Sequence, residues 1–228
     1  MSTETISVNQ DIRTLRREAA EAFQMRMQDQ GTYVVRLLSS PGSGKTTLLE
    51  ETTKRLGKEY RVGILVGDIA TNRDAERLSP LATTAQITTG GACHLELPLV
   101  EKILPQLGQS SFEFLFIEDV GNLVCPASHD LGEHLRTLVL STTEGDDKPG
   151  KYPKAFRTSQ AVVINKIDLL PYVPFSVERA MADARDVHGD IDFFPMSALS
   201  GEGVELWCDY LRLLRNKMMS KCANSIPE

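Results

Sequence analysis

The sequence predicts an α/β fold with a mainly parallel central sheet of about seven strands and helices on both faces. Short apolar segments rich in β-branched residues alternate along the chain with segments of helical periodicity. The apolar segments contain few polar residues, which is typical of strands buried on both faces of a sheet. With 228 residues, 41% hydrophobic and 25% charged, the chain has the composition of one globular domain with short appendages.

The individual elements follow from the local pattern. Strands are expected at residues 33–39, 61–67, 85–89, 112–118, 136–142, 161–165 and 192–196. Helices are expected between them at residues 46–56, 94–107, 176–188 and 204–218. Residues 143–157 combine Gly, Pro and charged residues without periodicity and are expected to form a long loop. Ligands of parallel sheets bind beyond the carboxyl ends of the strands, so the residues that follow each strand are the first site candidates.

An amphipathic helix is expected near the N-terminus. Apolar residues recur there at steps of three and four, namely Val8, Ile12, Leu15, Ala19, Phe23 and Met27. Gly31 is a suitable residue to end such a helix. We therefore divide the chain into an N-terminal amphipathic helix (1–31), an α/β domain (32–219) and a polar C-terminal tail (220–228).

Charge and targeting signals narrow the function classes. The net charge of −6 argues against nonspecific binding to nucleic acid or to an anionic membrane, so neither is expected as a partner. Residues 1–18 carry acidic residues early and no apolar core, unlike a secretory signal, and no apolar run approaches the roughly 20 residues of a membrane span. The four cysteines are interpreted as thiols rather than a disulfide framework, which predicts a cytoplasmic protein.

A phosphate-binding loop follows the first expected strand. The stretch "SSPGSGKTT" (39–47) matches G-x-x-x-x-G-K-[ST], except that Ser39 fills the first glycine position. Glycines in such a loop let backbone amides wrap around phosphates, and the lysine reaches the β- and γ-phosphates. The nucleotide-binding residues expected here are Gly42, Ser43, Gly44, Lys45, Thr46 and Thr47. With this loop between a strand and a helix, the fold class becomes a P-loop NTPase.

Carboxylates after two further strands are candidates for Mg²⁺ and for the attacking water. Glu118 ends an apolar strand in "FLFIEDVGN", where the amide of Gly121 could sense the γ-phosphate. Asp68 and Asp74 follow another strand and are plausible for either role, so spacing alone does not decide among the three carboxylates. We place Mg²⁺ on Thr46 and Glu118, and the expected catalytic residues are Lys45, Asp68, Asp74 and Glu118.

The base-recognition signal favours guanine. "NKID" supplies Asn165, Lys166 and Asp168 at the end of an apolar strand. A carboxylate can accept hydrogen bonds from guanine N1–H and the 2-amino group together, whereas adenine would leave the anion unpaired at a cost of several kcal/mol, roughly. Ser197 and Ala198 in "MSALSGEG" can supply an amide to guanine O6. The predicted activity is hydrolysis of GTP to GDP and phosphate, with slow intrinsic turnover because no arginine finger is identifiable.

A metal site is the third expectation. Cys93 and His94 adjoin a glycine pair, and Cys125 lies on the loop that leaves the strand ending at Glu118. Two thiolates and an imidazole suit Zn²⁺ or Ni²⁺, and hydrolysis could move the loop that carries Cys125. Packing of a Cys–His pair remains an alternative, whereas a catalytic dyad is disfavoured because adjacent residues rarely point at each other. His129 and His134, which flank "DLGE" near the cysteine loop, are interpreted as structural, with metal ligation as the alternative.

The motifs together resemble one family. The stretches "SSPGSGKTTLLEE", "GDIATNRDAERL", "GGACHLE", "VGNLVCPAS", "TEGDDKPGKYPKAF" and "NKID" are similar to the HypB family of GTPases, which assist nickel insertion into [NiFe]-hydrogenase. The resemblance implies a metallochaperone that binds Ni²⁺ or Zn²⁺ at Cys93, His94 and Cys125. It also implies a homodimer that depends on nucleotide or metal, a small zinc-containing chaperone partner (HypA), and the hydrogenase large subunit as recipient.

The chain departs from that family in three places. It lacks the N-terminal His-rich or cysteine motif that many members carry, because its first cysteine is Cys93 and its first histidine is His94. It has Glu96-Leu97-Pro98 where some members place another histidine, and Asp119 where an asparagine is expected. Two rival functions stay open: a nucleotide-gated GTPase switch without metal chemistry, and a metallochaperone GTPase for another nickel enzyme.

Overall fold

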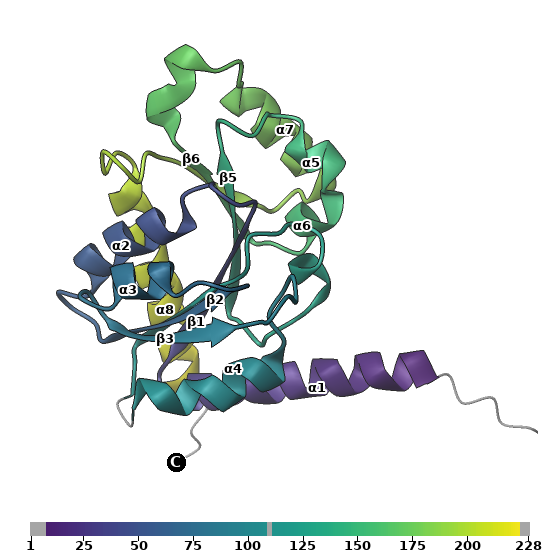
Figure 1. Cartoon of the computed structure of the whole chain (residues 1–228), viewed down its shortest axis with the longest axis vertical. Helices are drawn as coiled ribbons and strands as arrows, with labels where there is room; N and C mark the ends of the chain where they lie inside the picture. Colours follow the sequence, from purple (N-terminus) through teal and green to yellow (C-terminus); the bar gives the residue numbers. More distant parts are fainter. Residues whose placement is uncertain (1–7, 109–110, 224–228) are drawn as a thin grey trace, which may run out of the picture.

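A seven-stranded sheet forms the centre of the protein in the computed structural model, which describes residues 8–108 and 111–223 (Figure 1). The strands are β1 (Tyr33–Ser39), β2 (Val62–Asp68), β3 (Thr83–Thr88), β4 (Phe114–Glu118), β5 (Leu135–Ser141), β6 (Ala161–Asn165) and β7 (Asp192–Pro195). Their order is β3-β2-β4-β1-β5-β6-β7, and every pair is parallel. Each strand lies within two residues of its expected position.

The sheet is covered on both faces. On one face the core contains residues of α2 (Lys45–Leu56), α3 (Arg73–Leu78) and α8 (Val204–Ala223). On the other face it contains residues of α1 (Val8–Asp29), α4 (Leu97–Ile103), α6 (Pro153–Arg157) and α7 (Val177–Val187). Neighbouring strand residues such as Val34 and Val35 are fully buried in opposite cores, as the almost uninterrupted apolar strands predict. The predicted fold class is confirmed.

Two expected elements differ from the structure. The helix expected at 94–107 begins only at Leu97, because Pro98 is tolerated in a first turn but not in a helix interior. It gives way at Leu104–Leu107 to a short 3-10 helix (η1). The loop expected at 143–157 contains two short helices, α5 (Lys148–Lys151) and α6, each with a proline in its first turn.

The N-terminal helix is amphipathic over only part of its length. Phe23 and Met27 are buried against the sheet, together with Ala20 rather than the expected Ala19. Ile12 and Leu15 are exposed. One end of α1 extends beyond the domain (Figure 1).

The division of the chain at residues 31 and 219 stays a prediction. The last helix, α8, includes residues 220–223, and the rest of the expected tail lies outside the described residues. Within the part of the chain that the structure covers, no helix has the length and apolar character needed to cross a membrane.

The strand order positions the site. β1 lies between β4 and β5 in the sheet. The chain therefore passes from one side of β1 to the other between β4 and β5. The carboxyl ends of β1, β2 and β4 meet at one edge, where loops from different parts of the sequence are brought together.

Candidate functional site

A cavity of about 650 Å³ lies at this edge of the sheet. Most of the residues expected to handle phosphate and Mg²⁺ line it, together with one base-recognition residue: Gly42, Gly44, Lys45, Thr46, Thr47, Asp68, Asp74, Glu118, Gly121 and Lys166. Residues separated by more than a hundred positions therefore share one hollow, as the parallel topology predicts.

The phosphate loop has the backbone that anion binding requires. Gly42 and Gly44 adopt φ values of +75° and +94°, in the left-handed region that favours glycine. A Cβ atom on Gly44 would lie 2.4 Å from the Asn165 side-chain nitrogen, so this glycine also permits a close approach. Lys45 Nζ donates to Ser39 Oγ over 2.7 Å, and burial lowers the pKa of this lysine. Ser39 therefore holds the lysine that is expected to meet the phosphates.

The residues present fit a Mg²⁺ ion beside Thr46. Thr46 Oγ1 donates to Glu118 Oε1 over 2.9 Å, while the buried Glu118 Oε2 has no hydrogen-bond partner. Burial raises the pKa of Glu118 to about 7, although the nearby Lys45 acts in the opposite direction. Asp68 instead accepts from two backbone amides of its own loop, and Asp74 pairs with Arg77 at 3.7 Å. Of the three candidate carboxylates, Glu118 is the one that contacts the phosphate-loop threonine.

The base-recognition residues adjoin the same loop. Asn165 donates to Ser43 O over 2.9 Å and accepts from the Ala198 amide over 3.0 Å. Lys166 donates to Gly42 O over 2.7 Å. Its φ of +65° is the only positive value of a non-glycine residue in the described chain, and this conformation costs about 1–2 kcal/mol.

Two further residues are expected to recognise the base, and each lies within two residues of Lys166 or Ala198 in the sequence. Asp168 is exposed at the start of η3 (Ile167–Tyr172), and Ser197 is buried directly before Ala198. The exposed carboxylate of Asp168 is accessible to a ligand. The structure thus brings the "NKID" and "MSALS" segments together around Asn165.

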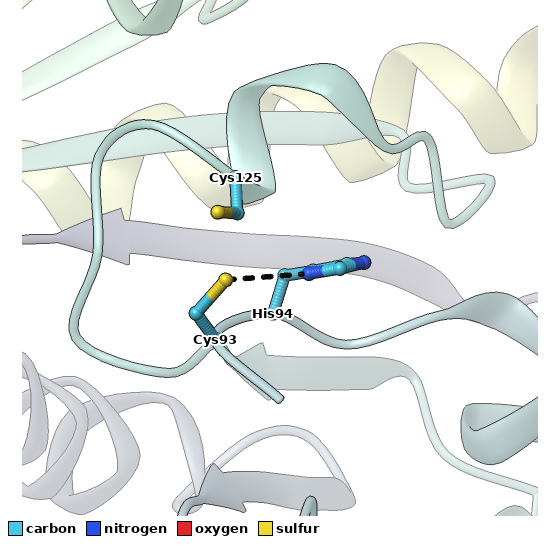
Figure 2. A group of neighbouring side chains, drawn as sticks. All are labelled: Cys93, His94 and Cys125. Carbon is cyan, nitrogen blue, oxygen red and sulfur yellow. Dashed lines mark hydrogen bonds between the residues drawn. The ribbon is translucent and has the colours of Figure 1, made fainter. Parts of the chain in front are cut away.

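Cys93, His94 and Cys125 form a second cluster, which we call the metal corner. The first two lie on the loop after β3 and the third on the loop after β4, with both sulfur atoms turned toward each other (Figure 2). The three donor atoms lie within 4.8 Å of one another. Cys93 Sγ lies 3.8 Å from His94 Nδ1, so these neighbours do approach each other, contrary to the sequence expectation. The hydrogen bond and nearby charge of Cys125 raise the pKa of Cys93.

Asn122, which sequence reasoning missed, joins the metal corner to the phosphate loop. It forms an isolated antiparallel bridge with Ser39, and its side-chain nitrogen donates to Cys93 O over 3.3 Å. The preceding Gly121 packs so closely on the phosphate loop that a Cβ atom would lie 3.1 Å from Pro41. The only sequence signal for this link was the position of Asn122 between Gly121 and Cys125.

A buried ion pair holds both the loop after β3 and the loop after β4. Arg36 and Asp119 have fully buried side chains that form a salt bridge, in which Arg36 Nε donates to Asp119 Oδ2 over 2.8 Å. The other carboxylate oxygen of Asp119 accepts from the Leu95 and Val120 amides, over 3.1 and 2.8 Å. The unexpected Asp119 thus anchors the residue after His94. The charged Arg36 within the apolar "YVVRLLS" was the signal that could have revealed this pair.

The chain matches one family model and several known proteins. A family model described as the CobW/HypB/UreG nucleotide-binding domain matches residues 33–195. Hydrogenase maturation factor HypB of Escherichia coli K12 is 44% identical over 211 residues, which cover 92% of this chain and 73% of the relative. Hydrogenase/urease maturation factor HypB of Helicobacter hepaticus is 42% identical over 201 residues, covering 86% and 82%.

Solved structures give the same result. HypB from Helicobacter pylori in complex with nickel superposes with a TM-score of 0.84 at 37% identity, covering 89% of this chain and 95% of the other. HypB from Archaeoglobus fulgidus gives 0.81 at 35% identity, covering 89% and 99%. A LAO/AO transport system kinase, 15% identical with a TM-score of 0.54, shares only the P-loop NTPase fold. The matching domain model, the relatives and these structures together show that the chain belongs to the HypB branch of the CobW/HypB/UreG family.

Proposed function

We propose that the protein is a GTP-hydrolysing metallochaperone that binds Ni²⁺ or Zn²⁺ and assists nickel insertion into [NiFe]-hydrogenase. The observation that carries the proposal is the contact of Asn122 with both Ser39 and Cys93. This contact connects a phosphate-binding loop to a cluster of metal-ligating side chains. A change at the γ-phosphate can therefore be transmitted to the backbone of Cys93 through a direct contact.

The proposed GTP hydrolysis rests on the cavity at the edge of the sheet. Lys45 and the amides of the phosphate loop would bind the β- and γ-phosphates, and Asp168 with Asn165, Lys166 and Ala198 would select guanine. Thr46 and Glu118 would hold Mg²⁺, which supplies positive charge to the phosphate oxygens. Asp68 and Asp74 line the same cavity and are the candidates to orient the attacking water.

The proposed binding of Ni²⁺ or Zn²⁺ rests on the metal corner. Two sulfur donors and one imidazole suit a soft or borderline ion, so Ni²⁺ or Zn²⁺ is the proposed cargo. Three ligands leave one coordination position open, which a second subunit or an acceptor protein could fill. This open position supports a homodimer controlled by nucleotide or metal, with a HypA-like chaperone and the hydrogenase large subunit as further partners. Free cysteines fit a cytoplasmic location.

Metal titrations in three nucleotide states test the proposal. Purified protein is titrated with Ni²⁺ and with Zn²⁺ in the apo form, with GDP and with a non-hydrolysable GTP analogue, while oligomeric mass is followed. Metal binding is expected to change with nucleotide and to be lost in Cys93→Ala and Cys125→Ala. Binding that ignores nucleotide and survives both substitutions would contradict the proposal and leave a GTPase switch without metal chemistry.

The recipient is tested separately. The Helicobacter hepaticus relative is named for both hydrogenase and urease maturation, which makes another nickel enzyme the second candidate recipient. A strain carrying Lys45→Ala should lose hydrogenase activity and regain it with excess nickel. Wild-type hydrogenase maturation together with a urease defect would favour the second candidate.

A further inference from the structure

A second group of metal-ligating side chains adjoins the metal corner. His94, Glu96 and His129 each offer one donor atom, and these atoms lie within 4.8 Å of one another. We propose that these three residues form a nitrogen–oxygen metal-binding set that shares His94 with the thiolate set and binds a borderline divalent cation such as Ni²⁺, Co²⁺ or Zn²⁺. The set includes His129, for which the sequence favoured a structural role and left metal ligation as the alternative.

The hydrogen bonding of His129 leaves the correct atom available. Its Nδ1 lies 2.9 Å from Cys125 O, and a carbonyl oxygen can only accept, so the proton of the neutral ring is on Nδ1. The lone pair is therefore on Nε2. A backbone carbonyl that receives one ring N–H while the other nitrogen binds metal is the usual arrangement for histidine ligands.

His94 faces the two sets with its two nitrogens. Nδ1 is directed toward Cys93, whereas Nε2 lies 3.5 Å from Glu96 Oε1 and, although buried, has no hydrogen-bond partner. A neutral imidazole has one lone pair, so His94 can serve only one set at a time. An ion that binds His94 is therefore held either with the thiolates or with Glu96 and His129.

The present ring geometry needs one adjustment. The rings of His94 and His129 are stacked with centroids 3.9 Å apart and planes at 24°, so their lone pairs do not converge on one point. Binding requires the ring of His94 to turn, because His129 Nδ1 is held by Cys125 O, and this is a fast motion for a partly exposed side chain. Glu96 also lies 3.7 Å from Arg16, but both side chains are about half exposed and such a pair contributes little.

One buried guanidinium fixes the backbone positions of both histidines. Arg36 donates to His129 O, and its partner Asp119 accepts from the Leu95 amide next to His94. Arg136 adds a second donor to His129 O, over 3.1 Å. The backbone beneath both histidines is thus held in place, and the contact with Cys125 O orients the ring of His129, as supporting hydrogen bonds do around metal ligands.

Cobalt titration of the full chain tests the second set separately from the thiolates. In a Cys93→Ser/Cys125→Ser background, Co²⁺ is expected to bind with d–d absorption but without a thiolate charge-transfer band. Adding His129→Phe, which keeps a ring to stack on His94, is expected to weaken this binding at least about tenfold. Glu96→Gln in the same background gives a second, nearly isosteric removal of a ligand.

His188→Phe is the matched control. His188 is also partly buried with Nδ1 bonded to a backbone carbonyl, Ser159 O at 3.0 Å, but it belongs to no metal-ligating group found among the described residues. This variant is expected to leave cobalt binding unchanged. Thermal unfolding of every variant confirms that each is compared in its folded form.

Three results would overturn the proposal. The first is Co²⁺ binding in the double-serine background that is no stronger than with His94→Ala added. The second is residual binding that neither His129→Phe nor Glu96→Gln weakens. The third is two Co²⁺ ions per intact chain, which would exclude the sharing of His94. The thiolate charge-transfer band of the intact protein reports the metal corner separately, so failure of the proposed function would be recognised on its own.

Discussion

The phosphate-binding edge and the metal corner differ in how their side chains are held. At the phosphate-binding edge, the functional side chains form hydrogen bonds to residues 39–43 of the phosphate loop: Lys45 to Ser39, Lys166 to Gly42 and Asn165 to Ser43. In the second, the donors come from two loops, and their positions depend on Arg36 and Asp119 below them. The nucleotide site is therefore largely self-supporting, whereas the metal corner depends on a buried ion pair in the sheet.

Removal of the buried cation should have the largest effect. Arg36→Met leaves Asp119 buried without its partner and is expected to cost about 3–5 kcal/mol of unfolding free energy, measured in urea. Where the variant remains folded, Co²⁺ binding should weaken more than binding of a GTP analogue. Arg36→Met/Asp119→Asn should recover part of the loss, because the amide oxygen can still accept from Leu95. A loss below about 1 kcal/mol would mean that the ion pair does not support the metal corner.

Removal of the phosphate-loop lysine should affect the phosphate-binding edge alone. Lys45→Ala is expected to lower GTP hydrolysis by about 10²–10³-fold, because a buried charge aimed at the phosphates is lost. Metal affinity of the apo protein should not change. Lys54→Ala is the matched control, since this lysine is exposed on the same helix and bonds only to Glu51. Equal phosphate release by both variants would contradict the assignment.

Asn122→Ala tests whether the two regions communicate through one side chain. The difference in metal affinity between the GDP and GTP-analogue forms, expected to be about 1–3 kcal/mol, should shrink toward zero. Hydrolysis itself should stay within a few-fold of wild type. Val124→Ala, at an exposed position two residues further along the same loop, should preserve the difference. Undiminished coupling in Asn122→Ala would show that the signal takes another route.

A small effect of pH is expected from a histidine outside both regions. His134 accepts from the Val34 amide and stacks on Tyr33, and burial lowers its pKa to about 4. The unfolded chain, with a pKa near 6.5, then binds more protons, so stability falls as pH decreases from about 6.5 to 4. His134→Gln should reduce this fall in urea midpoints measured at pH 7 and 5. An unchanged pH dependence would contradict the assignment.

The sequence alone determined the elements whose cause is local. Continuous apolar runs predicted all seven strands to within two residues, because burial on both faces requires them. The phosphate loop could be recognised because its left-handed glycines and its lysine are neighbours in the chain. Cys93, His94 and Cys125 could be proposed together because parallel strands deliver their loops to one edge.

Tertiary structure decided what depends on distant contacts. Spacing could not show that Glu118, rather than Asp68, contacts Thr46, because the sheet places that carboxylate there. Nor could it show that Asp119 pairs with Arg36 or that His129 stacks on His94, since these partners are brought together only by strand order and loop crossing. Burial and partner identity are properties of the packed molecule, and these two quantities set the charge and donor availability of every side chain in the site.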